Sequence, residues 1–156
     1  MTCPRSWVRT GLVALTLLHL ALAIWIMLGP HSFYDLAWVN MNMAYNEHLL
    51  LDFGAMNLAL GLVLGTAART MDHRLLRTAL QGAVWFWAAH FVIHLRYLHA
   101  MTTGNTALLM TALGVTVVLP AALLTLVRRT VQPTSSAAKQ PEPSRTPLAK
   151  RGPNGS

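Results

Sequence analysis

Hydrophobic residues fall into four long stretches separated by short polar links. The stretches run from about Val8 to Leu28, His48 to Ala68, Ala79 to Leu98 and Thr106 to Val127. A helix needs about 20 residues to cross a hydrocarbon core of about 30 Å, and each stretch is close to that length. No strand-like alternation with turn residues lies between them, and helices satisfy their own backbone hydrogen bonds in lipid. The pattern predicts an all-α integral membrane protein with four transmembrane helices.

Short links join the expected helices, which favours an antiparallel four-helix bundle over residues 1–129. Gly61 and Gly65 form a GxxxG pattern in the second helix, and Gly54 lies on a nearby stripe, so a neighbouring helix can come close. Residues 130–156 hold five prolines among Ser, Thr, Lys and Gln. Because such a composition cannot bury a core, we expect a disordered, basic, Pro-rich cytoplasmic tail.

The first stretch has a competing interpretation as a cleaved signal peptide. Ala21-Leu22-Ala23 resembles a cleavage site. The apolar run continues past this site to Leu28, and its full length favours an uncleaved transmembrane anchor.

Composition and charge agree with the membrane class. Of the 156 residues, 54% are hydrophobic and 11% charged, whereas soluble domains are about one quarter charged. The formal net charge of +7 would suit nucleic acid, but the basic residues flank apolar runs and form no stripe with aromatic residues. We therefore expect the lipid bilayer as partner and no nucleic acid. Cys3 is the only cysteine, which excludes an intramolecular disulfide and a cysteine metal cluster.

The basic residues also predict the orientation. They precede the first stretch, lie between the second and third, or follow the fourth, and Arg96 alone falls on the other side. The first group consists of Arg5, Arg9, Arg69, Arg74, Arg77, Arg128, Arg129, Lys139, Arg145, Lys150 and Arg151. By the positive-inside rule both termini are cytoplasmic, in a multi-pass protein of the cell membrane. The loop of residues 29–47 then faces outward, with aromatic side chains suited to the interface.

Ionisable residues gather in the outer half of the expected bundle. His48 and Asp52 lie four residues apart in the second stretch, and His90 and His94 do so in the third. Residues four apart share a helix face, so the two pairs could meet across the interior. His19 in the first stretch lies about 14 Å below its outer end and could reach them from below. Intramembrane ionisable residues are candidates for function.

Imidazoles and a carboxylate at matching depth suit a transition metal such as Zn, Fe, Cu or Ni, or an axial contact to haem. The candidate metal ligands are His48, Asp52, His90 and His94, with His19 as a possible fifth. Four further residues lie near these positions in the sequence or in the expected bundle and could orient the ligands. They are Glu47, Asn57, Tyr97 and Arg96.

Other interpretations of the same residues stay open. The polar groups could only bond one another, with Arg96 neutralising Asp52. His and Asp could exchange protons near neutral pH, or bond a quinone between aromatic walls at Trp85, Phe86 and Trp87. The glycine-rich face could instead pack against a larger membrane complex, which would make the chain an accessory subunit. No phosphate-binding loop, nucleophile elbow or HExxH motif is present, so whether the chain is an enzyme is left open.

Several motifs resemble an uncharacterised family of small four-span integral membrane proteins from actinobacteria. They are Pro30-x-Ser32-Phe33-Tyr34, then Tyr45-Asn46-Glu47-His48-Leu49 with Asp52-x-Gly54, and the His90 to His94 pair. The resemblance covers roughly residues 8–127 and implies the four-span topology. This chain has Ala44 where such proteins tend to carry proline, which bears on the loop rather than on the helix faces.

Overall fold

The structure is a computed structural model that describes residues 3–41, 43–100 and 102–129. Every regular element in these residues is helical, which confirms the all-α class. Their order is α1 (Cys3–Leu28), α2 (Pro30–Tyr34), α3 (Ala37–Asn40), α4 (Glu47–Thr70), α5 (His73–Leu95), a 3₁₀ turn (Leu98–Ala100) and α6 (Thr103–Arg129). The expected tail of residues 130–156 lies outside the described residues.

Local capping sets the ends of α4 and α5. The Asn46 side chain accepts a hydrogen bond from the Leu49 amide at 3.1 Å, which satisfies a free donor in the first turn of α4. Asp72 does the same for α5 through the Leu75 amide at 2.9 Å. Met71 ends α4 in the left-handed conformation, with φ 52°. These residues explain why two long helices meet after a link of only two residues.

Three of the long helices, α1, α4 and α6, are long and apolar enough to cross a membrane. The hydrophobic stretch from Ala79 to Leu98 predicted a fourth span over the region of α5. This helix does not reach the same hydropathy, because it includes arginines near its start, Gln81 in its middle, and His90 and His94 near its end.

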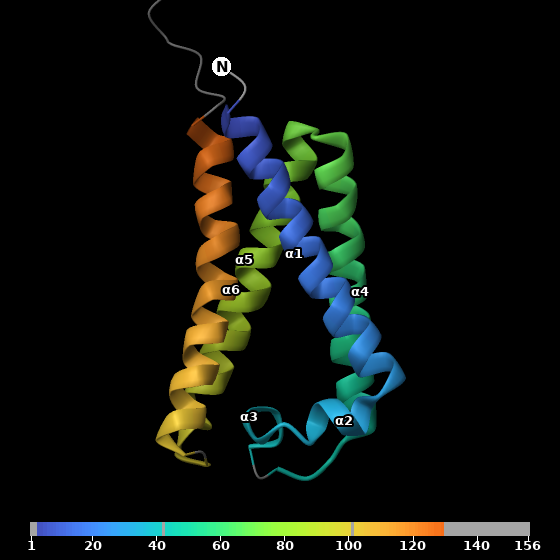
Figure 1. Ribbon diagram of the computed structural model, residues 1–156, viewed down its shortest axis with the longest axis vertical. Helices are drawn as coiled ribbons and strands as arrows, with labels where there is room; N and C mark the ends of the chain where they lie inside the picture. Colours follow the sequence, from blue (N-terminus) through green and yellow to red (C-terminus); the bar gives the residue numbers. More distant parts are fainter. Residues whose placement is uncertain (1–2, 42, 101, 130–156) are drawn as a thin grey trace, which may run out of the picture.

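The long helices pack as two pairs, α1 with α4 and α5 with α6 (Figure 1). One end of the structure holds the start of α1, the α4–α5 link and the end of α6, and we call it the basic end. The other end holds α2 and α3, and we call it the cap end. The pairs lie close together at the basic end and diverge toward the cap end (Figure 1).

The contact between α1 and α4 depends on glycine. A Cβ added at Gly61 would lie 3.0 Å from Cδ2 of Leu20 and 3.3 Å from Cβ of His19, and one at Gly65 would lie 3.1 Å from Cγ2 of Thr16. Gly54 is similarly close to side chains of α1. The expected close approach of a neighbouring helix is thus confirmed. The neighbour is α1, so this face of α4 is covered within the chain.

Burial is concentrated at the basic end. The larger core cluster draws on all four long helices and is made of Val8, Leu12, Leu15, Leu64, Ala67, Ala68, Leu76, Ala79, Leu80, Ala83, Leu123, Leu124 and Val127. A smaller cluster joins Met41 near α3 to Trp87, Leu109 and Leu113. The two helix pairs are therefore held together mainly by apolar packing at the basic end.

We predict that Gly61→Leu weakens the α1–α4 contact, because the new side chain must displace the side chains of Leu20 and His19. Overpacking of this kind typically costs about 1–3 kcal/mol. Thermal unfolding of the detergent-solubilised protein measures the loss. Gly82→Leu in α5 is the matched control, since a Cβ there meets nothing within 4 Å. Equal melting temperatures for the two variants would contradict the glycine contact.

Candidate functional site

His19 links the two helix pairs through a buried hydrogen bond. The indole Nε1 of Trp87 donates to His19 Nε2 at 3.0 Å, and both side chains are buried. Because indole can only donate, Nε2 must be the acceptor, so the proton sits on Nδ1 and is donated to the Leu15 carbonyl at 2.7 Å. Both ring nitrogens of His19 are thus occupied. In this arrangement His19 joins α1 to α5 and has no free lone pair for a metal.

His90 and His94 form a direct pair on the interior face of α5. Their Nε2 atoms lie 3.1 Å apart, so one ring donates a hydrogen bond and the other accepts it. His94 is buried, with 8% of its surface exposed. Its Nδ1 is also buried and has no hydrogen-bond partner among the described residues. A buried polar atom without a partner is costly, which points to a bound group or water at this place.

Aromatic rings enclose His90. It stacks on Phe53 of α4 at 5.0 Å between ring centroids and lies parallel to Phe86 at 6.2 Å. Trp87 meets it edge-on at 5.7 Å. Phe86 and Trp87 therefore belong to the interior, as expected for walls of a site, whereas Trp85 is 75% exposed.

The His48–Asp52 pair expected at the site lies elsewhere. His48 Nε2 and Asp52 Oδ2 are 3.6 Å apart, but their side chains are 87% and 62% exposed. The i,i+4 pairing is correct and the inward orientation is wrong. The buried stripe of α4 runs through Gly54, Asn57 and Gly61, and at about 100° per residue Asp52 lies about 160° from Gly54 around the helix.

The residues expected to orient the ligands do not lie together in the structure either. Glu47, Arg96 and Tyr97 are exposed, and Arg96 forms no ion pair with a described residue. Asn57 is fully buried: its Nδ2 donates to the Phe53 carbonyl at 2.8 Å, while its Oδ1 has no partner in the described part of the chain. In these residues no group of three or more His, Cys, Asp and Glu side chains is placed to hold one metal ion. Of the five predicted ligands, the structure thus brings together only His90 and His94 on an interior face.

Aromatic side chains also gather at the cap end. Tyr45 stacks on His31 at 4.0 Å and meets Tyr34 edge-on at 5.1 Å, and Tyr34 donates a hydrogen bond to the Met43 carbonyl. Burial, and secondarily the Glu47 carboxylate, raise the pKa of the Tyr45 phenol. The Tyr45 phenol is therefore uncharged at neutral pH, and its ring contacts tie the loop to the start of α4.

No protein-family model, curated protein or solved structure matches the chain. The resemblance to small four-span actinobacterial proteins stays a prediction.

The His19–Trp87 hydrogen bond was not predicted from the sequence. Trp87 lies three residues before His90 and seven before His94, which is the spacing of one helix face. That spacing places the indole with the histidines rather than with Trp85.

We predict that Trp87→Phe lowers the melting temperature, because it leaves His19 Nε2 buried without a donor. Such an unmet group costs about 1–3 kcal/mol. Trp85→Phe on the exposed face of α5 is the matched control and should change little. A Trp87→Phe variant as stable as the control would show that the His19 contact contributes nothing to stability.

Proposed function

We propose that the chain is a multi-pass integral membrane protein of the cell membrane. In this proposal α1, α4, α5 and α6 are the four spans of an antiparallel bundle, and both termini are cytoplasmic. The position of the basic residues supports this orientation by the positive-inside rule. The start of α1 and the end of α6 at the same end of the structure agree with an even number of crossings (Figure 1).

The surface of α5 supports counting it as a span despite its lower hydropathy. Its polar side chains His90 and His94 face the interior, while Trp85, Val92 and Ile93 are more than half exposed. A helix with apolar residues outside and polar residues inside suits lipid around it.

Cysteine labelling tests the topology. In a Cys3→Ser background, we expect Asp35→Cys in the cap-end loop to react in intact cells with a membrane-impermeant maleimide. Asp72→Cys in the α4–α5 link should react only after the cells are opened, since the proposal places this link in the cytoplasm. Both positions are exposed in the structure. The reverse labelling pattern would contradict the orientation, and equal labelling of both in intact cells would contradict a spanning α4.

We further propose that His90 and His94 bind a transition-metal ion in the outer half of the membrane. The observation that carries this proposal is the 3.1 Å separation of their Nε2 atoms. Two nitrogens about 2.0–2.1 Å from one ion, at angles between square and tetrahedral, lie about 2.9–3.4 Å apart. The separation of the two nitrogens therefore matches that of two adjacent ligands, and both rings would turn so that their lone pairs point at the ion instead of at each other. The unpartnered Nδ1 of His94 is free to bond a group that would orient the ring.

The ligand set differs from the one expected from the sequence. His19 is committed to Trp87 and Leu15, and the His48–Asp52 pair is exposed. Two protein ligands would leave the other coordination positions to water or an exogenous ligand, whereas structural sites are closed by four protein ligands. Haem would need only one of the two imidazoles as an axial ligand, because both project from the same face of α5.

Proton exchange is the second candidate, and one observation favours it. The Nε2 atoms of His90 and His94 share a direct hydrogen bond, so a proton can pass between the rings. Elemental analysis separates the two candidates, since only the first requires a bound ion.

We predict that the purified protein carries close to one equivalent of transition metal, and that His90→Leu with His94→Leu abolishes it. Inductively coupled plasma mass spectrometry measures the metal directly. His48→Leu with Asp52→Asn is the matched control and should retain the ion, because these side chains lie on the exposed face of α4.

Three outcomes decide the assignment. Loss of metal in both double variants would restore the larger ligand set predicted from the sequence. Retention in the His90 and His94 variant would show that the ion binds elsewhere. A metal-free parent protein would rule out the metal site and leave proton exchange.

A further inference from the structure

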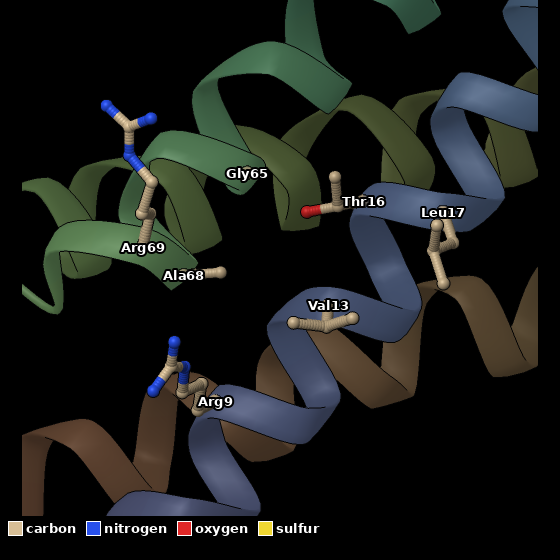
Figure 2. A pocket seen from close by; sticks show the side chains of 7 residues that line it. All are labelled: Arg9, Val13, Thr16, Leu17, Gly65, Ala68 and Arg69. Carbon is tan, nitrogen blue, oxygen red and sulfur yellow. The ribbon is translucent and has the colours of Figure 1, made fainter.

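A groove between α1 and α4 opens at the basic end, about 220 Å³ in volume (Figure 2). Val13 and Leu17 of α1 line it on one side, and Gly65 and Ala68 of α4 on the other. It lies away from His90 and His94, so the proposed metal site does not account for it.

Small residues create the hollow and keep it apolar. Gly65 has no side chain, and a Cβ there would already be 3.1 Å from the Thr16 methyl group. The Thr16 hydroxyl turns back to donate to the Leu12 carbonyl at 2.8 Å, which satisfies its polar atom within α1. The surface that remains for a ligand is almost entirely hydrocarbon.

Two cations border this hydrocarbon surface. Arg9 of α1 and Arg69 of α4 both line the groove from facing helices; the Arg9 side chain points toward the space between the helices, and the Arg69 side chain extends away from Arg9 (Figure 2). Both side chains are exposed, and neither forms an ion pair with a described residue. No carboxylate lines the groove. The groove is thus an apolar channel with two cationic side chains at its border.

We propose that this groove binds an anionic phospholipid of the cytoplasmic leaflet. Arg9 and Arg69 pair with the headgroup phosphate, for which guanidinium groups have the right donor geometry. One acyl chain lies along Val13, Leu17 and Gly65. From Arg9 to Leu17 the helix rises about 12 Å, which fits within one leaflet of a core of about 30 Å. The inference rests on the proposed orientation, which puts the basic end at the cytoplasmic surface.

Native mass spectrometry of the full-length protein tests the proposal. The probes are phosphatidylglycerol and phosphatidylcholine with identical acyl chains, titrated into the detergent-solubilised protein. We expect phosphatidylglycerol to be retained preferentially, and Arg9→Gln with Arg69→Gln to weaken its retention about tenfold or more, given two cation contacts of ordinary strength. Arg74→Gln with Arg77→Gln removes the same charge from exposed positions of α5 outside the groove and should change retention less than twofold.

A second variant tests the channel without touching the charges. Val13→Trp fills the groove and should also weaken retention, whereas Val118→Trp, at an exposed position of α6 outside the groove, should not. If the two charge variants weaken retention equally, the lipid is held by nonspecific electrostatic attraction rather than by this groove. If inorganic phosphate competes fully with phosphatidylglycerol, the groove binds a free anion rather than a lipid. Both results overturn the proposal. Melting temperatures of the variants identify any loss caused by misfolding, and a reversed cysteine-labelling pattern would count against the orientation rather than against the groove.

Discussion

The close approach of α1 and α4 is the constraint on which the rest of the structure depends. Gly61 brings the backbone of α4 close to His19 and Leu20, where a Cβ would lie 3.0–3.3 Å from their side-chain atoms. With α1 held there, the His19 ring projects toward α5 and accepts the hydrogen bond from Trp87. Hydrophobic burial provides no preference for protein over lipid within a membrane, so such backbone contacts and buried hydrogen bonds must specify the arrangement. One glycine stripe therefore fixes both a helix pair and the bond that joins it to the second pair.

Polar groups in this structure divide according to whether they have partners. His19 uses both ring nitrogens and acts as a structural link. His94 and Asn57 each keep one buried atom that no described residue satisfies. Because an unmet polar group is more costly in a low-dielectric interior than in water, the two kinds of site have different physical meanings. The satisfied histidine contributes to folding, and the unsatisfied groups are the places where an additional ion or molecule gains most by binding.

The sequence predicted the all-α class and the glycine contact well, because both follow from local spacing and composition. Asn46 and Asp72 are recognisable helix caps, and the structure uses both. The spacing of residues could not predict how α4 is rotated about its own axis relative to the other helices. Positions 48 and 52 share a face by periodicity alone, but which face meets the interior depends on the partner helix. The buried face of α4 could have been predicted from Gly54, Asn57 and Gly61, because small residues in a membrane helix mark the side that contacts another helix. The structure places His90 and His94 together on the interior face of α5, whereas His48 and Asp52 lie on the exposed face of α4.

The distribution of packing explains why the candidate site lies where it does. The larger apolar cluster fills the basic end with side chains from all four long helices, while the cap end relies on a smaller cluster and on aromatic contacts of the loop. Regions with fewer buried apolar contacts open at lower free energy than the main core. A ligand approaching His90 and His94 from the basic end would have to cross the dense cluster, whereas the cap end presents two short helices and a loop. Apolar packing that holds the helices together is thus concentrated at the basic end. The cap end, with fewer buried apolar contacts, is where a ligand can enter.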